Sequence, residues 1–95
     1  MLTMNTINTK TPNQIATTIA GNLRVLRKKG KLSMKALAEL SGVSYGSLKR
    51  FESTGQISLS SLLKLAIVLD CVDDFEYLFK KTEILSIQEI INGKV

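Results

Sequence analysis

The sequence predicts an all-α protein built from five helices, followed by a short apolar tail. Two observations predict this class. Apolar residues recur at helical spacing through most of residues 11–80, and a residue that favours a helix N-cap precedes nearly every such stretch. Ninety-five residues make one domain of a size that often gains stability by dimerising. We therefore divide the chain into a flexible arm at 1–10, a helical domain at 11–80 and a tail at 81–95.

The first helix should begin at Pro12. Thr11 is a suitable N-cap, Pro12 suits the first helical position, and Gln14 has the spacing of a capping box. The helix should run to about Lys29 and end at Gly30. One face carries the apolar residues Ile15, Ile19, Leu23 and Leu26.

Residues 32–52 predict two short helices joined by a tight turn. Ser33 and Ser44 are N-cap residues, Gly42 can adopt the left-handed conformation that the turn requires, and Val43 should fill the angle between the helices. Leu37, Ala38 and Leu40 form an apolar stripe on the first of these helices, and the inner face of the second should carry Leu48 and Phe51. On the second helix, the residues that should face outward are Tyr45, Gly46, Ser47, Lys49, Arg50 and Ser53. This arrangement is that of a helix-turn-helix.

Two further helices should complete the domain. Ser58 caps the fourth, which is apolar almost all round from Leu62 to Leu69 and should be the central buried helix. Asp73 and Glu76 have capping-box spacing for a fifth helix. Its inner residues should be Phe75, Leu78 and Phe79.

The tail is unusually apolar for its length. Its large apolar residues are Ile84, Leu85, Ile87, Ile90 and Ile91. Ser86 and Glu89 have the spacing of a capping box, which favours a short helix, whereas Ile84 and Leu85 also suit a strand paired with a partner chain. We expect these residues to form a dimer or partner interface; the alternative is that they fold back on the protein's own core.

Charge is divided along the chain, whose net charge is +5. Residues 24–50 carry eight basic side chains against Glu39 alone, while residues 70–95 carry six acidic ones against three lysines. This asymmetry indicates one face for a polyanion and another for a protein, although a solubilising mixture would look the same. The cluster of Arg27, Lys28, Lys29 and Lys31 has the further alternative of a solvated helix end.

Catalysis, metal binding and membrane insertion are not expected. The chain has no histidine and one cysteine, Cys71, which suits a small buried side chain in a reducing cytoplasm. Ser61 and Lys64 match a serine–lysine pattern of penicillin-binding enzymes, but its companion motifs are absent. Residues 1–10 lack the features of a signal peptide, and the longest apolar run, 65–69, is too short to span a bilayer. We expect a cytoplasmic protein without enzymatic activity, cofactor or small-molecule ligand.

The helix caps, the turn glycine and the apolar positions described above resemble those of the XRE family of helix-turn-helix regulators, which includes the lambdoid phage repressors. The resemblance extends from Leu32 to Phe79. Its structural positions are filled by Leu32, Ser33, Leu37, Ala38, Gly42, Val43, Ser44, Leu48, Glu52 and residues 62–66. The resemblance implies a lambda-repressor-like domain that binds double-stranded DNA.

The resemblance also implies which residues meet DNA. Tyr45, Gly46 and Arg50 align with positions that contact bases, and Lys49 could reach a base or a phosphate; the alternative for Tyr45 is a surface contact on its own helix. Phosphate contacts are expected from Ser33, the Met34 amide, Lys35, Ser44, Ser47, Thr54 and Gln56. Many relatives have glutamine where this chain has Met34 and Tyr45, so their operator sequences do not transfer.

Two more implications concern structure and partners. In the resembling repressors an arginine late in the first helix pairs with a glutamate that ends the third, which assigns Arg27 and Glu52 a structural ion pair. Residues 46–71, with the acidic fifth helix and the apolar tail, are most similar to HipB-like antitoxins. That similarity implies a homodimer that represses its own operon at an inverted-repeat operator and docks a HipA-like kinase toxin. The alternatives are a stand-alone phage-type or metabolic repressor, and a protein-binding adaptor that does not bind DNA.

Overall fold

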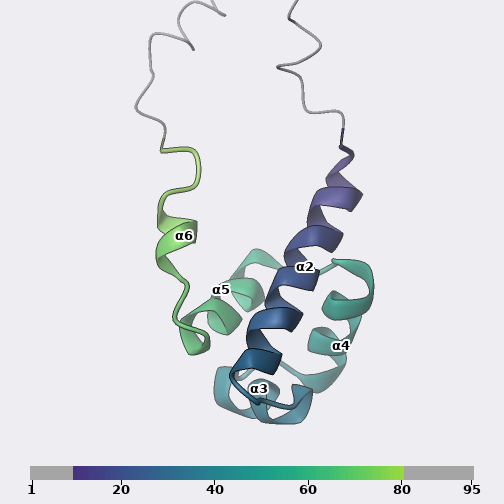
Figure 1. Cartoon of the computed structure of the whole chain (residues 1–95), viewed down its shortest axis with the longest axis vertical. Coiled ribbons are helices and arrows are strands. Elements are labelled where there is room, and N and C mark those ends of the chain that lie inside the picture. Colours follow the sequence, from purple (N-terminus) through teal and green to yellow (C-terminus); the bar gives the residue numbers. More distant parts are fainter. Residues whose placement is uncertain (1–9, 81–95) are drawn as a thin grey trace, which may run out of the picture.

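The computed structural model describes residues 10–80, and within this range the chain is entirely helical apart from its turns (Figure 1). The helices are α2 Pro12–Lys29, α3 Met34–Ser41, α4 Tyr45–Thr54, α5 Leu59–Val68 and α6 Asp73–Glu76. The predicted all-α class is confirmed. The predicted arm, except for Lys10, and the predicted tail at 81–95 lie outside the described residues.

Four of these helices begin at the caps that the sequence predicts. The Thr11 hydroxyl accepts a hydrogen bond from the Gln14 amide at 3.1 Å, and the Gln14 side chain accepts one from the Thr11 amide at 2.9 Å, which completes a capping box. Ser33, Ser44 and Ser58 cap α3, α4 and α5 in the same way, each accepting from the amide three residues later. The helix starts are therefore fixed by local chemistry.

The turn between α3 and α4 depends on Gly42 and Val43. Gly42 has a φ of 80°, in the left-handed region where a side chain would be strained, and its amide donates to the Ala38 carbonyl oxygen. Val43, only 4% exposed, lies between the helices as predicted. This turn sets the angle at which α4 leaves α3.

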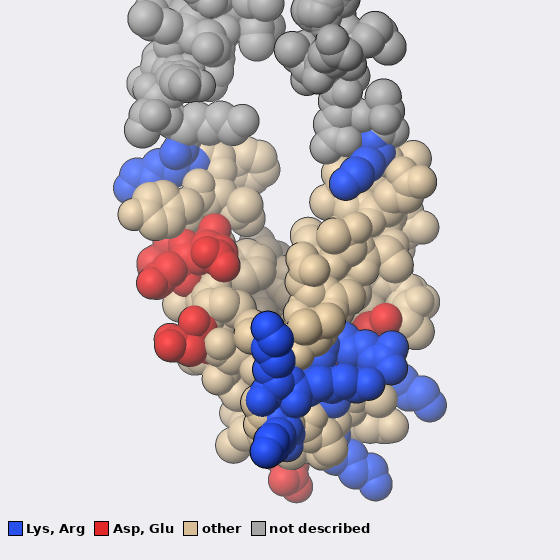
Figure 2. Space-filling model, viewed as in Figure 1, with Lys and Arg blue, Asp and Glu red and all other residues tan. Residues whose placement is uncertain are grey.

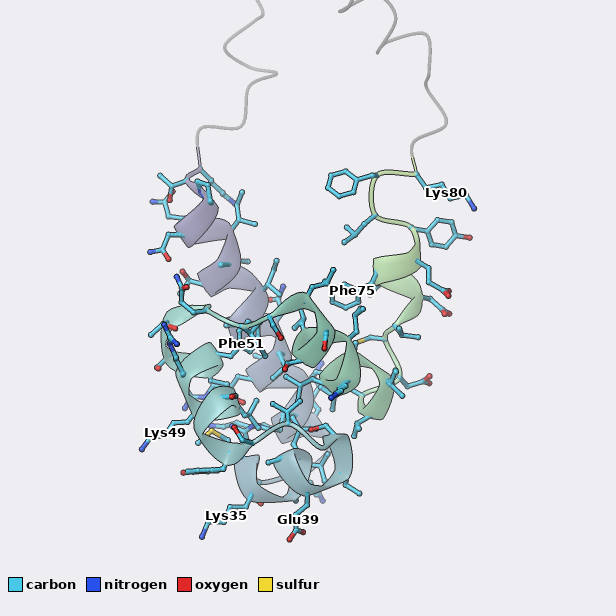
Figure 3. The ribbon with its side chains drawn as sticks, turned by 180° about the vertical axis from the view of Figure 1, so that it is seen from behind. Lys35, Glu39, Lys49, Phe51, Phe75 and Lys80 are labelled. Carbon is cyan, nitrogen blue, oxygen red and sulfur yellow. The ribbon has the colours of Figure 1, made fainter. Side chains whose placement is uncertain are left out.

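The core lies where α2, α3, α4 and α5 meet, with α2 packed on α4 and α3 packed on both α4 and α5. Figure 3 shows Phe51 pointing from α4 into this space. The largest fully buried side chains are Leu37, Leu48, Phe51 and Leu65. Burying each of these contributes about 1.5–3 kcal/mol, so the inner face of α4 is held firmly against the domain.

Apolar residues of α3 and α5 are in part exposed. Leu40, which belongs to the apolar stripe predicted on α3, is 63% exposed. The prediction of a central buried fourth helix is wrong within residues 10–80: Leu65 and Ala66 are buried, but Leu59 and Ile67 are each 63% exposed. The reason is geometric, since α3 and the neighbouring helices cover only one side of α5, while its apolar residues continue around the helix.

The predicted fifth helix also differs. The structure has a single turn at α6 with Val72 at the N-cap and no side-chain cap, so the predicted capping box of Asp73 and Glu76 is wrong. Phe75 is half-buried, but Leu78 is 55% and Phe79 95% exposed, contrary to their predicted inner positions. α6 ends at Glu76, with Tyr77 as its C-cap residue, and Phe79 has a φ of 64°. Leu78 and Phe79 therefore do not continue the helical face that carries Phe75.

Candidate nucleic-acid interface

One side of α4 is buried and the other is free. Leu48 and Phe51 lie in the core, while the four residues predicted to contact bases are all exposed. These residues are Tyr45, Gly46, Lys49 and Arg50. In Figure 3, Lys49 projects outward from α4 and Lys35 projects from α3 at the same end of the molecule. The helix-turn-helix thus presents a polar, basic helix face to its surroundings.

Arg27 and Glu52 form the ion pair that the resemblance implies. Arg27 Nε donates to Glu52 Oε2 at 2.7 Å and Nη2 donates to Oε1 at 3.0 Å. The remaining guanidinium nitrogen, Nη1, donates to the Leu32 carbonyl oxygen at 2.8 Å. Both side chains are only 8% exposed. One guanidinium therefore ties the end of α2 to the start of the helix-turn-helix and to the last turns of α4.

The electrostatics of this pair keep Arg27 charged. The hydrogen bonds to Glu52 raise the pKa of Arg27 above its ordinary value, against the opposing effect of burial, and the negative charge of Glu52 raises it further. Because the pair is bidentate, the Glu52 carboxylate is satisfied internally. A negative charge close to the exposed face of α4 is thereby neutralised.

The N-terminus of α3 brings together three of the predicted phosphate contacts. The Ser33 hydroxyl accepts from the Ala36 amide at 3.0 Å, Met34 is half-buried with its side chain packed against the core, and Lys35 is exposed. Met34 occupies the first helical position, where its amide has no partner within the helix. Helix N-termini of this kind bind anions through free amides and the helix dipole.

The N-terminus of α4 has a similar arrangement. The Ser44 hydroxyl accepts from the Ser47 amide at 3.1 Å and donates to the Ser47 hydroxyl at 2.8 Å. Both serines are exposed. The Ser47 hydroxyl lies one turn before Arg50 on the helix, so polar groups continue along the exposed side.

Thr54 and Gln56 lie at the other end of α4. The Thr54 hydroxyl donates to the Arg50 carbonyl oxygen at 2.6 Å and accepts from the Gln56 amide at 3.1 Å. Thr54 therefore orients the turn, with its hydroxyl proton already donated, and the Gln56 side chain remains exposed. Gly55, between them, has a φ of 81° and closes the helix.

Sequence reasoning missed two serines near this turn. A hollow of about 330 Å³ joins Arg50 and Gln56 to Ser58 and Ser61, and Ser47 also lines it. Ser58 caps α5 by accepting from the Ser61 amide at 3.1 Å, so the N-terminus of a second helix lies beside Arg50. The sequence predicted Ser58 only as a helix cap. Its position two residues after Gln56 was the available sign that it also lies beside the predicted phosphate contacts.

Basic charge extends from α4 toward α2. A hollow of about 260 Å³ is lined by Arg24, Lys49 and Ser53 together with the Arg27–Glu52 pair. Figure 2 shows lysine and arginine gathered over the end of α2, while acidic residues gather on the side of α6. On the face shown in this view, the basic and acidic residues that are separated along the chain are therefore also separated in space.

The comparisons with known proteins agree with this geometry. A family model described as helix-turn-helix matches residues 23–74, which include α3, α4 and α5. No curated protein and no solved structure matches the chain. None of the described helices is long and apolar enough to cross a membrane. Because the family match spans more than half of the chain, the protein belongs to the XRE-type helix-turn-helix family of DNA-binding transcriptional regulators, and its helical domain has the lambda-repressor-like fold.

Proposed function

We propose that the protein is a repressor that recognises operator DNA by inserting the exposed face of α4 into the major groove. The observation that carries this proposal is the exposed row of Tyr45, Gly46, Lys49 and Arg50 on a helix whose opposite side is buried. The Arg50 guanidinium can donate to guanine O6 and N7 together. Gly46 lets the backbone approach the groove closely, and the Tyr45 ring can contact a thymine methyl group.

Phosphate contacts would hold α4 in register on the duplex. The α3 N-terminus offers the Ser33 hydroxyl, the Met34 amide and Lys35, and the α4 N-terminus offers Ser44 and Ser47. At the end of α4, the Gln56 side chain would contact the neighbouring phosphate together with Ser58 of α5, and the predicted contribution of Thr54 would be to hold this turn, because its hydroxyl proton is donated to the Arg50 carbonyl oxygen. Such contacts fix orientation and contribute affinity that falls with salt.

A dimer is required for useful specificity. The recognition helix has ten residues and reaches only a few base pairs, so one copy cannot define a unique site. Two copies related by a two-fold axis would bind an inverted repeat with half-sites about one helical turn apart. We propose that the apolar residues of the tail provide the dimer or partner interface, those residues being Ile84, Leu85, Ile87, Ile90 and Ile91.

We propose further that the protein is the antitoxin of a HipA-type operon, which it represses while docking the kinase. This rests on the similarity of residues 46–71 to HipB-like antitoxins and on the acidic residues at α6, which suit a basic protein surface. The stand-alone repressor is the alternative. The identity of the neighbouring gene, and co-purification with its product, separates the two.

Binding to the protein's own upstream DNA tests the proposal against an adaptor that does not bind DNA. Fluorescence anisotropy should show saturable binding to this duplex that a scrambled duplex does not compete away. Lys35→Ala should weaken binding and lower the salt slope by about one, because one phosphate contact is lost. Lys80→Ala is the matched control, since Lys80 lies at the opposite end of the molecule in Figure 3. Equal binding of both duplexes, or equal effects of both variants, would contradict the proposed function.

A further inference from the structure

An apolar groove lies between α2, α5 and α6. It has a volume of about 330 Å³. Its apolar lining includes Ile19, Leu26, Leu62, Leu69, Phe75 and Leu78. In Figure 1, α2 and α6 lie on either side of α5, and in Figure 3 the Phe75 side chain points from α6 toward α2. The groove is therefore lined by three helices whose apolar residues are not all buried in the core.

Apolar side chains around this groove are open to solvent in the described part of the chain. Ile19 is 40% and Leu26 37% exposed on α2, and Leu78 is 55% exposed after α6. Tyr77 and Phe79, the neighbours of Leu78 in the chain, are 70% and 95% exposed. Exposed apolar side chains gathered around a groove mark an interaction site.

The chain itself contains a segment of matching chemistry. Residues 81–95 follow directly from Lys80, close to Leu78 at the rim of the groove. If residues 86–91 are helical, Ile87, Ile90 and Ile91 share one face, and this is the form in which an amphipathic helix enters an apolar groove. We propose that the groove of each subunit receives residues 81–95 of a second copy, so that the two copies of the dimer exchange tails. This inference rests on the dimer of the proposed function.

Two observations favour a second copy over the chain's own tail. Tyr77 and Phe79 lie beside the groove-lining Leu78 in the chain and are 70% and 95% exposed, and an exchange that brings two copies together can cover them in both copies, whereas a tail in its own groove supplies no second copy to do so. A tail that folded back into its own groove would bring Glu83 toward the four acidic residues of 70–76, which would repel it.

The exchange is also compatible with DNA binding. In Figure 3, Lys35 and Lys49 lie at one end of the molecule, Lys80 lies at the other, and Phe75 lies between them. An interface built on the groove therefore leaves the exposed face of α4 free. Because each copy gives a tail and receives one, the contact is two-fold symmetric and closes as a dimer.

The position of Cys71 makes the exchange testable. Cys71 is the single cysteine of the chain and lines the groove, so a cysteine placed in the tail can be cross-linked to it. Leu85→Cys, Ile87→Cys and Ile90→Cys are made separately in the full chain, with Glu39→Cys as the control on exposed α3. Copper(II)–phenanthroline serves as the oxidant: two copper(II) ions accept the two electrons released when two thiols join as a disulfide, and the two thiol protons go to solvent. At least one tail variant should give a covalent dimer on a non-reducing gel, and Glu39→Cys should not.

Mixed samples then identify the copies that are joined. A copy carrying Cys71→Ser with Ile87→Cys, or the equivalent at the reactive tail position, is mixed with a tagged copy that retains Cys71. Exchange predicts a covalent heterodimer of one tagged and one untagged copy. Three results would overturn the exchange. They are a disulfide formed within one chain, a covalent dimer that persists when both copies lack Cys71, and a cross-link no stronger than the control in all three tail variants.

The same samples separate this inference from the proposed function. If the copies cross-link by exchange but bind no duplex, the DNA-binding proposal is wrong and the exchange stands. A protein that binds an inverted repeat as a dimer, but forms the disulfide only within its own chain, would keep the proposed function and remove the exchange.

Discussion

Arg27 of α2 and Glu52 of α4 are joined by two hydrogen bonds of 2.7 and 3.0 Å, although 25 residues separate them in the chain. The same guanidinium holds the Leu32 carbonyl oxygen just before α3. Three segments of the domain are therefore fixed at one buried point. The orientation of α4, on which any contact with bases depends, is set by this pair as well as by Leu48 and Phe51 in the core.

Replacing Glu52 by alanine should destabilise the domain. The substitution leaves the Arg27 guanidinium buried and without its carboxylate, at a cost of more than ~1 and up to about 5 kcal/mol. Thermal unfolding followed by circular dichroism measures this loss. Glu39→Ala, which removes an exposed glutamate from α3, is the control and should change stability by less than ~0.5 kcal/mol. Equal melting temperatures for the two variants would show that the pair does not contribute to stability.

Three glycines should respond differently to alanine. Gly42→Ala should cost about 1–2 kcal/mol, because its φ of 80° is strained for a side chain although the space is open. Gly55→Ala should cost more, since its φ is 81° and the new Cβ would meet the Ala16 backbone at 2.9 Å.

Gly21→Ala is the matched control for these two variants. Gly21 lies within α2 with nothing close to an added Cβ, so the variant should gain about 0.5–1 kcal/mol. Urea unfolding of the three variants gives the order. Equal stability of Gly42→Ala and Gly21→Ala would contradict the assigned turn.

The thiol of Cys71 should react slowly in the folded protein. Burial in the groove raises the pKa of Cys71, and the nearby carboxylates of Asp74 and Asp70 raise it further. The native state therefore keeps its thiol proton at a pH where the unfolded chain, with a thiol pKa of about 8.5, has lost it. Stability should fall as pH rises through this window, and Cys71→Ser should remove that component.

Iodoacetamide labelling near pH 9 tests the thiol directly, because only the thiolate reacts and about three quarters of an ordinary thiol is ionised there. Labelling should be slower for the native protein than for the same chain in urea. Equal rates would show that the thiol is not protected in the folded state.

Deleting Thr82 to Val95 should separate folding from association. The described helices should persist, because the core of Leu37, Leu48, Phe51 and Leu65 lies entirely before the deletion. Dimerisation should weaken, since burying each lost apolar side chain contributes about 1.5–3 kcal/mol before ordering costs. Sedimentation and circular dichroism measure the two effects. Loss of helical signal would place the tail in the core, and an unchanged dimer would place the interface elsewhere.

The sequence was most informative where structure is determined locally. Thr11, Ser33, Ser44 and Ser58 cap helices with their own neighbours, and the left-handed turn at Gly42 follows from the residue itself, so all were predicted. The exposed face of α4 was equally predictable, because helical periodicity separates Leu48 and Phe51 from Lys49 and Arg50.

Features that depend on coverage by other elements were not predictable. An apolar pattern such as that of α5 does not state how many neighbours cover it, and Leu59 and Ile67 remain exposed. The spacing of Asp73 and Glu76 imitates a cap, but α6 starts at Val72 without one. Ser58 and Ser61 join Arg50 only because the chain turns at Gly55, which brings the start of α5 beside α4.

The central claim, that α4 contacts bases as part of a dimer, is tested most directly by selecting binding sites from a random duplex library with the wild-type protein and with Arg50→Ala. The wild type should enrich an inverted repeat whose half-sites are about one helical turn apart. Arg50→Ala should lose about 1–3 kcal/mol of preference at one or two base pairs in each half-site and keep the rest of the pattern. An unchanged site with uniformly weaker binding, or no enriched repeat with the wild type, would contradict the account.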